Sequence, residues 1–86
     1  MRRYPTLTAL RAGEVVDLGG ILVEMDEGDI KNGDLYVAER NSGPHLLTAR
    51  KVVWCTCGCG AIDFICPTTV DYPFDGHECV KVREVE

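Results

Sequence analysis

The chain lacks a long apolar run, although 45% of its 86 residues are hydrophobic. No stretch approaches the roughly 20 consecutive apolar residues that a membrane-spanning helix needs. Residues 1–6, which begin with Met1-Arg2-Arg3, are followed by no apolar signal core. We therefore expect a soluble protein of the cytoplasm with no membrane partner, in a compartment that keeps its thiols reduced.

Basic residues are also few, with 9 Lys and Arg against 14 Asp and Glu and a net charge of −5. Binding to a phosphate backbone depends on clustered Lys and Arg, so direct nucleic-acid binding is disfavoured. No basic array accompanies the aromatic residues either. They are therefore expected to pack in or around the core and not to stack on bases.

The acids are unevenly distributed. Residues 13–39 hold eight of them against the single cation Lys31. A surface of this sign suits a basic partner protein, because complementary potentials speed encounter and suppress wrong partners. The acids that we expect to contact such a partner are Glu24, Asp26, Glu27, Asp29 and Asp34.

The acidic loop at residues 26–34 has two other interpretations. The loop lacks the regular oxygen ligands and the closing glutamate of an EF-hand, which excludes that calcium motif. A solvated loop that only promotes solubility is the alternative to a partner surface.

Alternating apolar residues and turn signals predict an all-β fold. Strands are expected near residues 15–18, 21–25, 35–40, 46–54, 61–66 and 79–85, with glycine- or proline-rich turns at intervals of roughly 8 to 12 residues. Charged residues at Arg50 and Lys51 predict a bend or bulge in the long segment 46–54. The whole chain, 1–86, is expected to form one domain, a small barrel or sandwich of five to six mostly antiparallel strands. Residues 1–13 form a lead-in segment with room for a helix of at most two turns before Gly13.

Five cysteines fall within 25 positions and are joined there by His77. In Cys55-Thr56-Cys57 and His77-Glu78-Cys79, soft ligands occur at alternate residues, and an extended backbone directs such a pair to one face. The spacing therefore predicts a structural zinc site with Cys55, Cys57, His77 and Cys79 as ligands and with Cys59 and Cys66 as substitutes.

Other interpretations of the cysteines stay open. The spacing departs from the paired C-x₂-C pattern of zinc ribbons, and a tight turn at residues 58–61 would place Cys55 opposite Phe64 as a buried apolar residue. Disulfide formation is a third interpretation, although an odd number of cysteines leaves one sulfur over. In the last strand, Cys79 is expected on the polar face with Lys81 and Arg83.

Several segments share features with a known group of proteins. These segments are residues 33–44, 46–49, 67–69, 72–75 and 78–82, which read GDLYVAERNSGP, LLTA, PTT, YPFD and ECVKV. Together they resemble small uncharacterised proteins encoded by bacteriophages and prophages. The resemblance implies an intracellular accessory protein that acts on host machinery. It supplies no catalytic residue, and residues 55–59 lie outside it.

The function that we expect from the sequence is non-catalytic binding of a basic host protein by surface occlusion, with homo-oligomerisation left open. One alternative is a β-barrel that sequesters a small ligand or nucleotide, with Arg40, Arg50 and Lys51 holding an anion. Another is a thiol-dependent enzyme with His45 or His77 as the base. Neither histidine occurs in a recognisable catalytic context, and His45, beside Pro44, is expected to be exposed.

Overall fold

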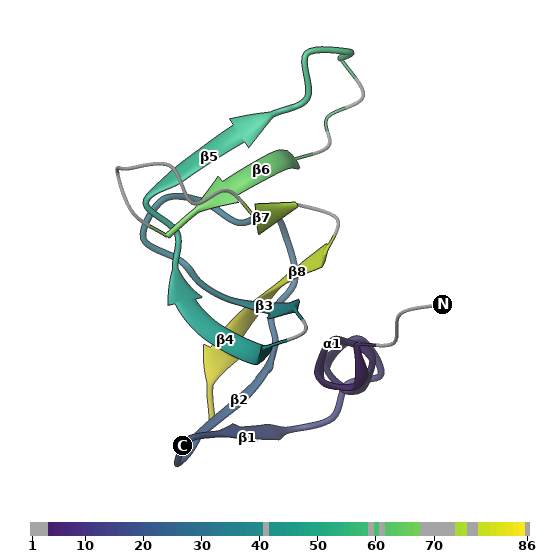
Figure 1. Cartoon of the computed structure of the whole chain (residues 1–86), viewed down its shortest axis with the longest axis vertical. Coiled ribbons are helices and arrows are strands. Elements are labelled where there is room, and N and C mark those ends of the chain that lie inside the picture. The colour runs from purple at the N-terminus through teal and green to yellow at the C-terminus, as the bar shows by residue number, and fades with distance from the viewer. Residues whose placement is uncertain are drawn as a thin grey trace.

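Strands make up most of the structure (Figure 1). The computed structural model describes residues 4–40, 42–58, 60, 62–67, 74–75 (backbone alone) and 78–85. In this part of the chain the elements are α1 (Pro5–Arg11), β1 (Val16–Leu18), β2 (Ile21–Met25), β3 (Leu35–Arg40), β4 (Gly43–Thr48), β5 (Lys51–Trp54), β6 (Ile62–Cys66), β7 (Phe74–Asp75) and β8 (Cys79–Glu84). The predicted all-β class is confirmed. There are more strands than expected because segment 46–54 divides in two and because β7 is a further short strand.

Five strands form an antiparallel sheet in the order β1-β2-β8-β3-β4. The last strand of the chain therefore lies at the centre, where Val80 pairs with Val37 of β3 and Val82 pairs with Met25 of β2. The edge strands β1 and β4 also contact each other. The sheet consequently curls around the side chains on one of its faces.

The side chains inside this curve form the helix-side core. Its fully or almost fully buried members are Leu7, Leu10, Val23, Val37, Val80 and Val82. Both leucines come from α1 and are 0% exposed, so the N-terminal segment is part of the core and not only a lead-in. Burying one leucine contributes about 1.5–3 kcal/mol, which is how tertiary packing holds a helix of only seven residues.

The start of α1 is held by a residue from the sheet. Pro5 occupies the first turn, and Tyr4 provides no side-chain cap. Instead, the carboxylate of Glu39 on β3 accepts hydrogen bonds from the backbone N–H groups of Thr6 and Leu7, with N···O distances of 3.1 and 3.3 Å. Negative charge is favourable at a helix N-terminus, so this contact both caps the helix and fixes it on the sheet.

The opposite face of the five-stranded sheet forms the hairpin-side core. Its buried residues are Ile30, Tyr36, Ala38, Ala49, Ile65 and Cys79. Ile65 comes from the second sheet, which has the order β5-β6-β7. The expectation that Cys79 lies on a polar face is wrong, because the second sheet covers the part of β8 where Cys79 pairs with Ala38.

The predicted irregularity at Arg50 and Lys51 is a break between strands. β4 ends at Thr48 in the first sheet and β5 begins at Lys51 in the second, while Ala49 between them is 0% exposed. Further along, Val53 pairs with Phe64, and a bulge between Val53 and Trp54 shifts the register so that Trp54 pairs with Ile62. Cys55 is therefore not opposite Phe64, as the alternative interpretation of a buried Cys55 requires, and it is only half-buried.

Candidate functional site

The acidic loop, residues 26–34, joins β2 to β3 and is tied to the sheets at both ends. The backbone N–H of Asp26 donates to the carbonyl of Lys81 at 2.8 Å, and that of Gly33 donates to the carbonyl of Ala49 at 2.7 Å. The Asp34 carboxylate accepts from the backbone N–H of Lys31 at 2.8 Å. Ile30 anchors the middle of the loop in the hairpin-side core. These contacts preorganise the side chains that the loop presents.

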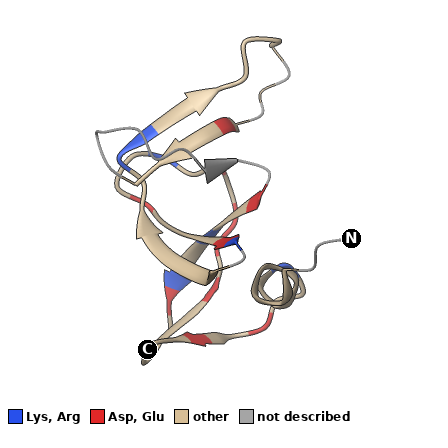
Figure 2. Cartoon of the chain, viewed as in Figure 1, with Lys and Arg blue, Asp and Glu red and all other residues tan. Residues whose placement is uncertain are grey.

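Three of the five acids expected to bind a partner form ion pairs with cations of β8. Arg83 lies 2.8 Å from Glu24, and the Lys81 ammonium lies 3.8 Å from Asp26 and 3.6 Å from Asp34. In Figure 2, basic segments of β8 lie beside acidic segments of the neighbouring chain. The hydrogen bond from Arg83 to Glu24 raises the pKa of the Arg83 guanidinium. Sequence reasoning missed these pairs, because it could not place β8 beside β2.

The other two acids, Glu27 and Asp29, are exposed at the outer part of the loop. Neither forms an ion pair with another residue in the described part of the chain. Gly28 lies between them with a φ of 99°, a conformation that an L side chain rarely adopts. The backbone thus presents two carboxylates on either side of a glycine. Neither is in an ion pair within the described structure, although the charge of Glu27 acts on the Arg83 guanidinium from a longer distance.

A shallow hollow of about 360 Å³ lies beside these carboxylates, where β2 diverges from β8. Its lining mixes both signs of charge with an apolar floor and comprises Arg11, Met25, Asp26, Glu27, Gly28, Cys79, Val80 and Lys81. The hollow is open to solvent, so a side chain from another molecule has access to Glu27.

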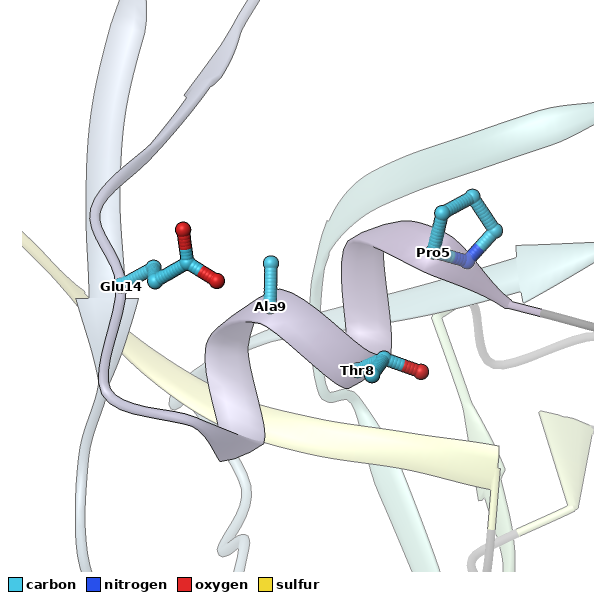
Figure 3. A pocket seen from close by; sticks show the side chains of 4 residues that line it. All are labelled: Pro5, Thr8, Ala9 and Glu14. Carbon is cyan, nitrogen blue, oxygen red and sulfur yellow. The ribbon is translucent and has the colours of Figure 1, made fainter.

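A second hollow of about 360 Å³ lies on the outer side of α1. Figure 3 shows its lining residues Pro5, Thr8 and Ala9 on the helix and Glu14 beyond it. One carboxylate is the only charged group among them. Neither hollow is lined by Arg40, Arg50 or Lys51, the residues proposed for an anion in the small-ligand interpretation.

Two of the predicted zinc ligands, Cys55 and Cys57, lie together where β5 ends and the chain turns. Their Sγ atoms are 2.6 Å apart, and the backbone N–H of Cys57 points at the Cys55 Sγ at 3.4 Å. Cys57 is exposed and Cys55 is half-buried. This turn lies at one end of the molecule (Figure 1).

The other described cysteines lie in the interior. Cys79 is 9% and Cys66 is 6% exposed, and both lie close enough to Tyr36 to influence its hydroxyl. Burial, together with these two thiols, raises the pKa of the Tyr36 phenol well above its usual value. The interior cysteines thus act as small apolar residues.

The zinc prediction is therefore only partly covered by the described residues. Cys59 and His77 lie outside them, and no group of three or more metal-ligating side chains occurs among residues 4–40, 42–58, 60, 62–67 and 78–85. A tetrahedral zinc with bonds of about 2.3 Å holds two sulfurs about 3.8 Å apart. Cys55 and Cys57 are closer than this, so they would have to separate to share zinc.

The remaining candidate, His45, is half-buried on β4 and not exposed as expected. Its Nε2 lies 2.9 Å from the Ser42 hydroxyl across the turn between β3 and β4. This contact explains the position of the ring without a catalytic role.

The described helix is too short to cross a membrane. The chain matches no protein-family model, no curated protein and no solved structure.

Proposed function

We propose that this chain is a non-catalytic binding protein that places its acidic loop against a basic surface of a host protein and blocks that surface. The observation that carries the proposal is the exposure of Glu27 and Asp29 on a loop whose ends and centre are fixed. A preorganised loop loses little conformational entropy on binding, and its carboxylates attract Lys and Arg side chains.

The charge distribution supports this choice of surface. Lys81 pairs with Asp26 and Asp34 at the base of the loop, whereas Glu27 and Asp29 are in no ion pair among the described residues. A partner cation that contacts Glu27 reaches the hollow between β2 and β8. Glu27 and Asp29 therefore form the centre of the proposed contact, and Glu24, Asp26 and Asp34 lie at its edge.

The nature of the partner is part of the proposal. The resemblance to phage and prophage proteins suggests a bacterial host protein, and the loop charge suggests that its contacted surface is rich in Lys and Arg. Such a surface normally binds an anionic ligand, which a bound acidic protein would exclude. Zinc is not required for this mechanism, and ligation by Cys55 and Cys57 would act only on the stability of the distant turn.

Charge reversal with a matched control tests the proposal. The pair Glu27→Lys and Asp29→Lys changes the net charge from −5 to −1, since each substitution adds two charges. The control pair Glu14→Lys and Glu84→Lys gives the same net charge from exposed acids outside the loop. Retention of basic bacterial proteins by the immobilised chain should fall at least about tenfold for the loop pair and much less for the control.

The same retention should fall when salt is raised, because exposed ion pairs are screened within about 10 Å at 0.1 M ionic strength. Equal loss of retention for the loop variant and the control variant would show that binding depends only on net charge. Unchanged retention for the loop pair, or retention that salt does not affect, would exclude this surface.

A further inference from the structure

The turn that follows β5 brings two thiols into direct contact. Cys55 and Cys57 have an Sγ···Sγ distance of 2.6 Å, against about 2.05 Å in a disulfide. Gly58 follows with a φ of 79°, which turns the backbone directly after the pair. The two sulfurs therefore need to move by only a fraction of an ångström to form a bond.

We propose that Cys55 and Cys57 form a dithiol that a low-molecular-weight disulfide, such as oxidised glutathione, converts reversibly into an intrachain disulfide. This site is separate from the acidic loop and does not depend on the proposed function. The pair follows β5 at one end of the molecule (Figure 1). Cys57 is exposed there, so small thiol reagents have access to it.

The difference in exposure assigns the order of the two steps. Cys57 is exposed, and its thiolate attacks one sulfur of the glutathione disulfide. The S–S bond of glutathione breaks, Cys57 becomes a mixed disulfide, and the first glutathione leaves as a thiolate that takes up a proton.

Cys55 then completes the exchange. Its Sγ accepts a hydrogen bond from the Cys57 N–H at 3.4 Å, a contact that keeps the sulfur beside Cys57. The Cys55 thiolate attacks the Cys57 sulfur and releases the second glutathione, which is also protonated. In total, two protein thiols are oxidised to one disulfide, and one glutathione disulfide is reduced to two thiols.

The resulting bond is labile. A disulfide that closes a loop of three residues removes little entropy from the unfolded chain, so it adds little stability. Exposed disulfides are also the ones that exchange readily with thiols in solution. Reduced glutathione should therefore restore the dithiol without unfolding the chain.

The test counts thiols in the full-length chain. The reduced protein is incubated with oxidised glutathione, and the remaining thiols are blocked with N-ethylmaleimide in denaturant, so that the buried Cys66 and Cys79 also react. The intact mass is then measured. The reduced chain should carry five labels, one for each cysteine, and the oxidised chain three with no bound glutathione. Reduced glutathione should return the count to five.

Single substitutions identify the pair. Cys59→Ser should keep the loss of two labels on oxidation, falling from four to two. Cys55→Ser should form no intrachain disulfide. Instead it should accumulate one glutathione on Cys57, because the thiol that would displace the glutathione is missing. Cys57→Ser should form no intrachain disulfide either. All three positions follow the end of β5 in the sequence, and unchanged far-UV circular dichroism should show that the variants fold.

Other results would overturn the proposal. A pair that still forms in Cys55→Ser would show that Cys57 reacts with another cysteine. A stable glutathione adduct in the unsubstituted chain would show that Cys55 does not resolve the mixed disulfide. Five labels after oxidation, with zinc bound to the purified protein, would assign the two sulfurs to a metal.

Discussion

The carboxylate of Glu39 accepts a hydrogen bond from the backbone N–H of Leu7, 32 positions earlier in the chain. Glu39 is 5% exposed and Leu7 is fully buried, so this contact joins α1 to β3 inside the protein. The same oxygen accepts from Thr6. One glutamate therefore sets where the helix starts and how it lies on the sheet.

Removal of this carboxylate should destabilise the fold. We expect Glu39→Ala to lower the free energy of unfolding by about 1.5–3 kcal/mol, because two N–H groups lose a charged acceptor in a buried place. Glu39→Gln should have a smaller effect, since its amide oxygen can still accept. Urea denaturation followed by circular dichroism measures both; equal stability of all three proteins would contradict a capping role for Glu39.

Leu7 provides a second test of the helix-side core. Leu7→Ala should cost about 2–5 kcal/mol, because it leaves a cavity between α1 and the sheet. Leu22→Ala is the matched control, since Leu22 is 45% exposed on β2 and its truncation should change stability by less than about 0.5 kcal/mol. In thermal unfolding, Leu7→Ala should have a clearly lower melting temperature than Leu22→Ala. Similar melting temperatures would mean that α1 is not packed as described.

The buried phenol of Tyr36 should make the folded state less stable in alkali. Burial raises the pKa of its phenol in the folded state, so above about pH 10 the unfolded chain loses this proton first. The unfolded state then binds fewer protons than the folded state, and stability falls as pH rises. Tyr36→Phe should remove this component. Parallel urea titrations from neutral pH to above pH 10 measure it, and identical pH profiles for the two proteins would contradict the assignment.

Lys81 links the acidic loop to β8, but its ion pairs should contribute little stability. Its side chain is 20% exposed and those of Asp26 and Asp34 are about a third exposed, so solvent screens both contacts. Lys81→Met should lower stability by about 1 kcal/mol or less, and less still in high salt. Lys51→Met, at an exposed position of β5, is the control. A large effect that salt does not change would show that Lys81 has another role.

The local sequence pattern is sufficient to predict several of the strands. Alternation of apolar residues predicted β2, β3 and β8, because a strand with one buried face repeats every two residues. It did not reveal that β8 is central. Alternation places Cys79 on the same face of β8 as Lys81 and Arg83, which predicts a polar environment. In the structure the second sheet packs over Cys79 but does not extend to Arg83, which is exposed. Local pattern cannot predict this packing, because the second sheet is formed by other segments of the chain.

The same limit applies to the candidate sites. The acidic loop is recognisable from composition, whereas the ion pairs that hold Glu24, Asp26 and Asp34 and leave out Glu27 and Asp29 depend on strand order. Cys55 and Cys57 were recognisable as a pair from their spacing. A turn at residues 58–61 also follows from the sequence, whereas the direct contact between the two sulfurs is known only from the structure.

The most direct test of the acidic-loop function is to map where a partner touches the chain. A zero-length carbodiimide reagent joins a carboxylate to a lysine only when the two are within ion-pair distance, and mass spectrometry locates the joined residues. After incubation in a bacterial lysate, we predict that cross-links to partner lysines concentrate at Glu27 and Asp29. Cross-links spread evenly over the exposed acids, with Glu14 and Glu84 joined as often as the loop, would contradict the proposal.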